Sequence, residues 1–242
     1  MLIFDDCFNY LNKIQTGTID LILTDPPYSI SRGSNFDKFS DKTSEKMKTK
    51  YTNHSIDFGY WDTEIDLDRL LLEYFRVLKK GGTVIIFYDI WKANLLKQSA
   101  QNAKFKQPRI GQWLKTNPVP INSKLNYLSN CSEYFFSFVK DKNPTFKSEY
   151  DNGIYQFPLC HGKERLEHPT QKPLGLIKSL ITKHSNKEDL VLDTFAGTST
   201  TAIACLETDR QYICIERDET FFKLSQSRID NYKKKKNLVY KK

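Results

Sequence analysis

The segment Asp25-Pro-Pro-Tyr28 carries groups that can hold a planar ligand with an amino group. Proline fixes φ and removes a backbone donor, so two prolines in succession hold the chain rigid and leave carbonyl oxygens unpaired. The Asp25 carboxylate and the Pro26 carbonyl can then accept two hydrogen bonds from one exocyclic amino group, and the Tyr28 ring can stack on a base. The alternative is a proline turn that only ends a strand.

A second candidate site is the turn at residues 195–201, where small residues let a ligand approach the backbone. The helix expected after it offers unpaired N–H groups in its first turn. Glu216 lies 19 residues beyond Gly197, at the end of the next strand, where a carboxylate can accept hydrogen bonds from both hydroxyls of a ribose. The turn has neither the G-x-G-x-x-G spacing nor the Gly-Lys-Ser/Thr of a phosphate-binding loop, so a nucleoside without phosphates fits it better. A plain strand-to-helix connection is the alternative.

Apolar runs and helical periodicities alternate along the chain and predict the elements that position these residues. Gly81 and Gly82 are expected to end the second helix. Strands that alternate with helices at this spacing indicate an α/β fold, with a mostly parallel twisted sheet and helices on both faces. The expected strands are residues 2–4, 19–23, 83–88, 109–114, 132–139, 190–192 and 211–215. The expected helices are one carrying Phe8, Leu11 and Ile14, then residues 66–79, 91–100 and 173–182, one ending near 207, and one after 216.

The chemistry-bearing segments all follow predicted strands. In an open α/β sheet the ligand lies beyond the carboxyl ends of the strands. Asp6, the Asp25 segment, the turn at 193–201 and Glu216 each occupy such a position. We therefore expect them to line one shared crevice.

The charge of the chain is unevenly distributed. The 242 residues include 37 Lys and Arg against 29 Asp and Glu, a net charge of +8. The excess is confined to residues 92–172 (net +7) and 228–242 (net +6), and the remaining stretches are slightly acidic. A balance of this size indicates a phosphate-bearing partner. The basic tail at 228–242 is interpreted as a solvated, frayed end, with a weak phosphate contact as the alternative.

Several classes of protein are excluded by composition. The five cysteines are scattered without a C-x-x-C pair and the four histidines form no cluster, so we expect no metal site. No apolar run approaches the roughly 20 residues needed to span a bilayer. The first residues lack the layout of a signal peptide. We expect a cytoplasmic protein with reduced thiols and no membrane contact.

Three segments together resemble the amino DNA methyltransferases that use S-adenosylmethionine, in the class whose catalytic motif precedes the cofactor motif. Asp25-Pro-Pro-Tyr28 is similar to the catalytic motif, Asp193-Thr-Phe-Ala-Gly197 to the cofactor motif, and His168-Pro-Thr-Gln-Lys-Pro173 to the segment before it. The resemblance runs from about Phe4 to Arg228, and the order of the three motifs is more specific than any one of them. It implies a single catalytic domain (1–242) with a circularly permuted Rossmann-like methyltransferase fold.

The resemblance also implies roles for individual residues. Asp25 and the Pro26 carbonyl would hold the target amino group, Pro27 completes the rigid motif, and Tyr28 would stack on the flipped-out base. Methyl transfer would be direct and in line, with positioning and electrostatics as the main catalytic contributions. The expected cofactor contacts are Asp6 at the adenine amino group, Glu216 at the ribose, Phe195 packed on the cofactor, His168, Thr170 and Lys172 near its methionine part, and Gly197, Thr198 and Ser199 in the turn.

Two positions depart from the family pattern, which commonly has proline where this chain has Thr194 and a second glycine where it has Ser199. Ser199 either crowds the cofactor or adds a hydroxyl contact. Asp25 at the first position of its motif favours the N6 amino group of adenine, because the cytosine-N4 enzymes more often begin this motif with serine. The alternatives are cytosine N4 or another substrate such as RNA, and a DNA-binding subunit that has lost cofactor binding.

The partner that the resemblance implies is double-stranded DNA, with a homodimer and a cognate endonuclease of a restriction-modification system as further expectations. Target recognition is expected within residues 92–167, which contain most of the +7 segment. Residues 31–62 are expected to form a mobile loop that folds over DNA, and a solvated loop without DNA is the alternative. Basic residues would neutralise phosphates and make binding salt-dependent. The expected DNA contacts are Arg32, Lys38, Lys42, Lys46, Lys48, Lys50, Lys115 and Lys124.

Overall fold

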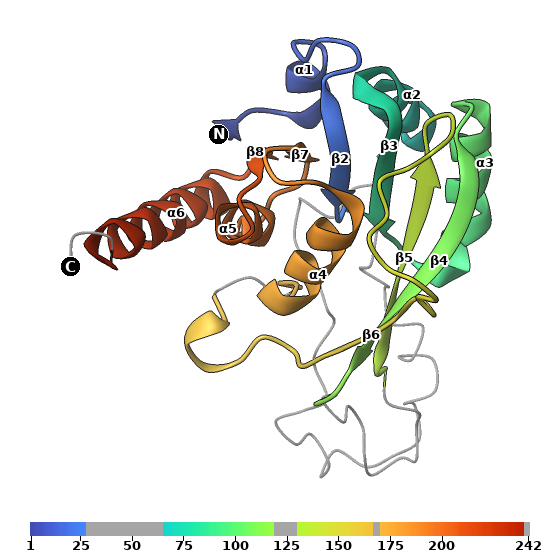
Figure 1. The fold of residues 1–242 in the computed structure, drawn as a ribbon. Helices are drawn as coiled ribbons and strands as arrows, with labels where there is room; N and C mark the ends of the chain where they lie inside the picture. Colours follow the sequence, from blue (N-terminus) through green and yellow to red (C-terminus); the bar gives the residue numbers. More distant parts are fainter. Residues whose placement is uncertain (28–64, 119–129, 167–169, 240–242) are drawn as a thin grey trace, which may run out of the picture. The chain divides into compact units, whose positions relative to one another are not determined.

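The computed structural model describes residues 1–27, 65–118, 130–166 and 170–239 (Figure 1). The chain divides into two compact units, Met1–Pro26 with Asp66–Lys242 and Pro27–Ile65. All the helices and strands described below belong to the first unit, and almost all of the second lies outside the described residues. No helix in the described ranges is long and apolar enough to cross a membrane.

An eight-stranded sheet forms the centre of the first unit, in the order β1-β8-β7-β2-β3-β5-β4-β6. All neighbouring strands run parallel except β5, which is antiparallel to both β3 and β4. The predicted mostly parallel sheet is therefore confirmed, and β6 is an additional strand that the sequence pattern did not predict. The strands are β1 (Leu2–Phe4), β2 (Ile19–Thr24), β3 (Leu78–Phe87), β4 (Lys106–Lys115), β5 (Ser132–Val139), β6 (Ile154–Phe157), β7 (Leu190–Asp193) and β8 (Gln211–Glu216).

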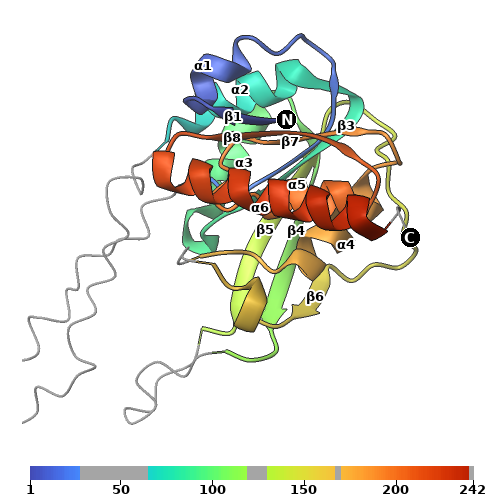
Figure 2. The same cartoon turned by 90° about the vertical axis from the view of Figure 1, so that its left-hand side faces the viewer.

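Helices cover both faces of this sheet, as the alternating pattern predicted (Figures 1 and 2). Helices α2 and α3 contact each other on one side, and α4 packs with α5 on the other. The helices are α1 (Cys7–Leu11), α2 (Leu67–Val77), α3 (Ala93–Asn102), α4 (Leu174–His184), α5 (Thr200–Glu207) and α6 (Glu219–Val239), with short 3-10 turns η3 (Ile90–Lys92) and η5 (Gly162–Glu164).

The core under α4 explains why this helix and these strands come together. Side chains alternate across a strand, so Leu21 and Leu23 of β2 point to one face. They pack with Ile85 and Phe87 of β3 and with an apolar stripe of α4. Each such side chain contributes roughly 1.5–3 kcal/mol when it is fully buried. The α4 stripe consists of Leu176, Ile177, Leu180 and Ile181.

The glycine pair at 81 and 82 does not end α2, contrary to the prediction. The helix ends at Val77, and both glycines lie inside β3. At Gly81 the chain has φ +80° and a Cβ would lie 2.9 Å from the Asn143 carbonyl oxygen. At Gly82 a Cβ would lie 2.9 Å from the Lys79 carbonyl oxygen. The glycines are therefore required by close backbone approach, at Gly81 to the segment that follows β5 and at Gly82 within β3.

The interpretation of residues 228–242 as a frayed end is wrong as far as Val239, because α6 continues to that residue. Its inner side packs on the protein: Ile229 is 1% exposed and joins a core cluster with Ile203 and Cys214. Arg228 donates hydrogen bonds to the Thr198 carbonyl oxygen at 2.8 Å and to Thr200 Oγ1 at 3.0 Å. At least one positive charge of this segment is thus part of the folded structure.

Close approach at Gly81 predicts a stability difference between two glycine substitutions. Gly81→Ala and Gly17→Ala both place alanine at positive φ, but nothing lies within 4 Å of a Cβ at Gly17. We expect about 1 kcal/mol of destabilisation at position 17 and at least about 2 kcal/mol at position 81, because only the latter adds a backbone clash. Urea unfolding of the two variants measures the difference, and equal losses would contradict the close-approach argument.

Candidate active site

The carboxyl ends of β2 and β7 bring the two predicted motifs together. The two strands are paired in parallel, with Ile22 opposite Leu192. Just beyond, Thr24 Oγ1 donates a hydrogen bond of 2.9 Å to Asp193 Oδ1. On the other side, β1 pairs with β8 so that Phe4 lies opposite Glu216. The predicted convergence of the strand ends is therefore confirmed.

Asp25 directly follows β2 and its carboxylate oxygens have different surroundings. Asp25 Oδ2 pairs with Lys172 Nζ. Within the described part of the chain, Asp25 Oδ1 is buried and has no hydrogen-bond partner. Burial raises the pKa of this carboxyl above its ordinary value, and the Lys172 ammonium opposes that rise. The rest of the motif comprises Pro26, which is buried, Pro27, and Tyr28, which lies outside the described residues.

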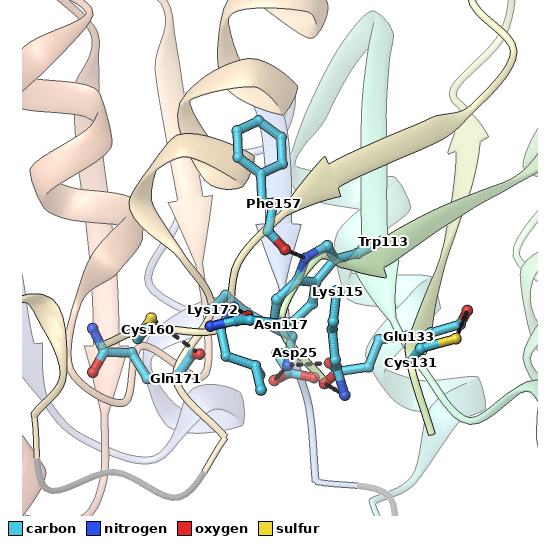
Figure 3. Close-up of polar contacts among 12 residues, drawn as sticks. Asp25, Trp113, Lys115, Asn117, Cys131, Glu133, Phe157, Cys160, Gln171 and Lys172 are labelled. Carbon is cyan, nitrogen blue, oxygen red and sulfur yellow. Dashed lines mark hydrogen bonds and ion pairs between the residues drawn. The ribbon is translucent and has the colours of Figure 1, made fainter. Parts of the chain in front are cut away.

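Lys172 continues into a row of alternating charges, which we call the charge chain: Asp25, Lys172, Glu133 and Lys115 (Figure 3). Lys172 Nζ lies 3.2 Å from Glu133 Oε2, and Lys115 Nζ lies 2.9 Å from Glu133 Oε1. Burial acts to raise the pKa of Glu133, but the two ammonium groups outweigh it and the pKa is lowered. Glu133 and Lys115 come from the neighbouring strands β5 and β4, so the sheet itself fixes their spacing.

The resemblance implies a place for Lys172 near the methionine part of a cofactor, and in the structure its ammonium pairs with the Asp25 carboxylate. Lys115 was expected to contact DNA, but its side chain is 11% exposed and paired with Glu133. The structure thus places Lys115 in the charge chain and not on an open basic surface. No sequence motif identifies Glu133, because a single acidic residue in a strand carries no spacing signal.

The segment that carries Lys172 is held by Gln171. Gln171 Nε2 donates to the Glu164 carbonyl oxygen at 2.9 Å, and its Oε1 accepts from Leu166 N at 2.9 Å. Glu164 Oε1 in turn accepts a hydrogen bond of 2.7 Å from Leu174 N, at the start of α4. Thr170 is half-buried in the same segment, and His168 lies outside the described residues.

Asp193 is the buried acceptor that fixes the start of the second motif. Besides Thr24, it accepts from Thr201 Oγ1 at 2.6 Å and from Phe195 N at 3.2 Å. Burial raises its pKa to about 6, although these donors favour the ionised form. One side chain thereby connects β2, the turn and the first residues of α5.

Thr194 has a structural role that explains its departure from the family pattern. Its hydroxyl makes a hydrogen bond with the hydroxyl of Tyr74, which is fully buried in α2, and lies 3.4 Å from Thr24 Oγ1. Proline has no hydroxyl and would leave the Tyr74 hydroxyl without this partner. Threonine here ties the turn to α2.

Glu216, the last residue of β8, holds the turn at residues 195–201 by hydrogen bonds. Its carboxylate accepts from Gly197 N at 2.7 Å and from Asp218 N at 2.8 Å. Burial raises the pKa of Glu216 to about 7. Helix α6 supports the same turn, because Ser225 Oγ donates to the Gly197 carbonyl oxygen at 2.6 Å and Arg228 donates to that of Thr198. Thr198 is itself buried.

Asp6, expected at a cofactor adenine, caps α1 with one carboxylate oxygen. Asp6 Oδ1 accepts from Phe8 N at 2.9 Å and from Asn9 N at 3.4 Å. Because it follows β1, it lies at the same edge of the sheet as Glu216, which ends β8. The turn, Glu216 and Asp6 thus present carboxylates and small residues suited to a nucleoside.

Ser199 adopts a conformation that ordinarily favours glycine, with φ +55° and ψ +42°. It is fully buried, and among the described residues its Oγ has no hydrogen-bond partner. The glycine that the family commonly has here is therefore explained by the backbone.

The conformation of Ser199 predicts that Ser199→Gly stabilises the protein by about 1 kcal/mol, since glycine adopts positive φ without strain. Ser227→Gly is the matched control, because Ser227 is exposed in the middle of α6 and glycine there should cost about 0.5–1 kcal/mol. Thermal and urea unfolding measure both. Destabilisation by Ser199→Gly would show that the hydroxyl contributes more than the backbone strain costs.

Most of the expected DNA contacts lie outside the described residues. These are Arg32, Lys38, Lys42, Lys46, Lys48 and Lys50 in one segment and Lys124 in another. Their roles stay predictions.

Comparison with known proteins agrees with this geometry. Residues 19–227 match the family model described as "DNA methylase" for N6 and N4 methyltransferases. The chain is 31% identical to the type II methyltransferase M2.MboI of Moraxella bovis, over 92% of this chain and 85% of that protein. It is 30% identical to M.HinfI of Haemophilus influenzae, over 96% of this chain and 68% of that protein.

Solved structures share the fold. The M1.HpyAVI–SAM complex superposes with a TM-score of 0.69 at 22% identity, covering 94% of this chain and 98% of that one. The cytosine-N4-specific PvuII DNA methyltransferase superposes with a TM-score of 0.69 at 16% identity, covering 93% of this chain and 84% of that one. With the family model matched over most of its length, the chain belongs to the N6-adenine and N4-cytosine DNA methyltransferases.

Proposed function

We propose that this protein transfers a methyl group from S-adenosylmethionine to the N6 amino group of an adenine flipped out of double-stranded DNA. The observation that carries the proposal is the Asp25 carboxylate, with one buried unpartnered oxygen, at a strand end joined to the cofactor motif by the Thr24–Asp193 hydrogen bond. A carboxylate oxygen in this position is an acceptor for an amino group brought next to a bound nucleoside cofactor.

The residues that would hold the cofactor follow from the site. Glu216 would accept from the ribose hydroxyls, and Asp6 would accept from the adenine amino group. Phe195 and the turn through Gly197, Thr198 and Ser199 would contact the cofactor directly. Thr170, with His168, would lie near the methionine part. The unpartnered Ser199 hydroxyl supports the fit, because a buried polar atom at a helix start is otherwise costly.

The chemistry required of the protein is mainly positioning. When bound, S-adenosylmethionine supplies an activated methyl group. Asp25 Oδ1 and the Pro26 carbonyl would accept the two hydrogens of the target amino group and turn its lone pair toward that methyl. Tyr28 would stack on the flipped base. The attacking nitrogen loses one proton, and Asp25, whose pKa burial raises, is placed to accept it.

Adenine is proposed over cytosine because the catalytic motif begins with Asp25. The cytosine-N4-specific PvuII enzyme shares the fold, and cytosine N4 is therefore the second candidate. Thr194 and Ser199 are the two departures from the family pattern that suggested a DNA-binding subunit without cofactor binding, but their surroundings do not favour that alternative. Both are accommodated in an intact turn that α6 and Glu216 hold in place.

DNA would be engaged by the basic residues of segment 31–62 and by Lys124, with target recognition within 92–167. The relatives are type II methyltransferases, which supports a restriction-modification role with a cognate endonuclease. We also propose that the protein is cytoplasmic and forms a homodimer.

Transfer of tritiated methyl groups from S-adenosylmethionine to unmethylated genomic DNA, followed by nucleoside analysis, tests the proposed function. Label in N6-methyladenine is the expected result, and label in N4-methylcytosine would overturn the choice of base. Asp25→Ala and Asp25→Asn should each lower the rate at least about 100-fold, because the oriented acceptor is lost. Asp209→Asn, which changes an exposed aspartate paired with Lys187, is the control and should keep the wild-type rate.

The raised pKa of Glu216 predicts that cofactor binding depends on pH. This pKa is raised to about 7, so the carboxyl is protonated below that pH and ionised above it. Only the ionised form accepts hydrogen bonds with both oxygens, so affinity for S-adenosylmethionine should rise about tenfold between about pH 6 and about pH 8. Isothermal titration calorimetry measures this. The nearby carboxyls of Asp218 and Asp193 can contribute as well, and Glu216→Gln isolates the effect because it should bind weakly at every pH.

A further inference from the structure

The two carboxylate oxygens of Asp25 have different surroundings. Oδ2 is taken by the Lys172 ammonium, and Oδ1 is the buried oxygen without a partner among the described residues. The ion pair at Oδ2 restricts rotation of the carboxylate, and the direction of Oδ1 is therefore restricted as well. If Asp25 receives the target amino group, Oδ1 is the oxygen that does so.

Lys172 is itself held from two sides. Its side chain is 7% exposed, and its ammonium lies between the carboxylates of Asp25 and Glu133. Its Nζ also lies 5.0 Å from the centroid of the Phe87 ring. A buried ammonium is stable only when it is paired, so Glu133 keeps Lys172 charged and in place when Asp25 turns to another ligand.

Glu133 is balanced in the same way by Lys115 (Figure 3). Their strands, β4 and β5, pair so that Trp113 lies opposite Glu133. Trp113 is 1% exposed and its Nε1 donates to the Phe157 carbonyl oxygen at 2.8 Å, so this end of the charge chain is fixed in the core. The chain thus runs from two rigid strands to the catalytic carboxylate.

We propose that Lys172, held by Glu133, is a positioning residue for methyl transfer that keeps Asp25 ionised and turns its Oδ1 toward the target amino group. This role rests on the proposed function of Asp25. It differs from the one expected of Lys172 from the sequence, which was contact with the methionine part of the cofactor. The two roles predict different losses when the ammonium is removed.

The first test compares Lys172→Met, Lys172→Arg and Glu133→Gln with wild type, measuring kcat, KM for genomic DNA and cofactor affinity across the acid limb of the pH profile. Among the described residues, the charged groups that face Asp25 are Lys172, Glu133 and Asp193. Lys172→Met should lower kcat about 100-fold and move the acid limb up by about one pH unit, because the remaining charges all favour protonation of Asp25. Cofactor affinity should change less than about twofold.

The other variants separate charge from position. Lys172→Arg should keep the acid limb at its wild-type pH and recover part of kcat, since the positive charge is retained. Glu133→Gln should lower kcat about tenfold without moving the acid limb upward, because Lys172 keeps its charge but loses its anchor. Glu207→Gln removes the partner of Lys178, away from the site, and should behave as wild type. Thermal unfolding shows that each variant is folded.

A second readout does not depend on turnover. In protein labelled with ¹³C at the aspartate carboxyl carbon, the Asp25 resonance, assigned with Asp25→Asn, should titrate at higher pH in Lys172→Met than in wild type. The inference is overturned if Asp25 titrates at the same pH in both, or if Lys172→Met weakens cofactor binding while kcat is unchanged. Failure of the proposed function is a different result: an absence of labelled methyladenine with the wild-type protein, whatever the titration shows.

Discussion

The hydrogen bond from Thr24 to Asp193 is the contact on which the site depends. It joins the ends of two neighbouring parallel strands, one leading to the catalytic motif and the other to the cofactor motif. Both partners are buried, so the bond is protected from water and its loss would leave a buried carboxylate short of a donor. The distance between the Asp25 segment and the turn at 193–201 is therefore set by sheet geometry.

The site contains two buried carboxylates that are compensated by different means. Asp193 is surrounded by neutral donors, two hydroxyls and a backbone N–H, and it serves as a fixed structural acceptor. Asp25 is compensated by an ammonium on one side only. Neutral donors saturate a carboxylate, whereas a single ammonium neutralises its charge and leaves an oxygen available. This difference separates the carboxylate that holds the turn from the one with an oxygen that has no hydrogen-bond partner among the described residues.

The sequence predicted the strands of the sheet and the convergence of their ends well, because buried strands and proline or glycine turns have strong local signals. It failed at Gly81 and Gly82, where the reason for glycine is an approach to Asn143 and Lys79 that only the folded chain reveals. It also missed Glu133 and did not predict the pairing of Lys172 with Asp25. The charge chain joins residues from β5, β4, the end of β2 and the segment before α4, and no local pattern connects them. Local motifs thus predicted which segments meet at this edge of the sheet, but the pairings between distant side chains required the structure.

The bond between Tyr74 and Thr194 has a consequence for how this chain can evolve. A proline at position 194, as the family commonly has, would deprive a fully buried tyrosine hydroxyl of that partner. A phenylalanine at position 74 would in turn remove the hydrogen-bond partner of the Thr194 hydroxyl. The two positions are therefore coupled, and a change of Tyr74→Phe before Thr194→Pro would avoid taking a partner from a buried tyrosine hydroxyl. The effect of a proline at position 194 thus depends, in this chain, on a residue 120 positions away.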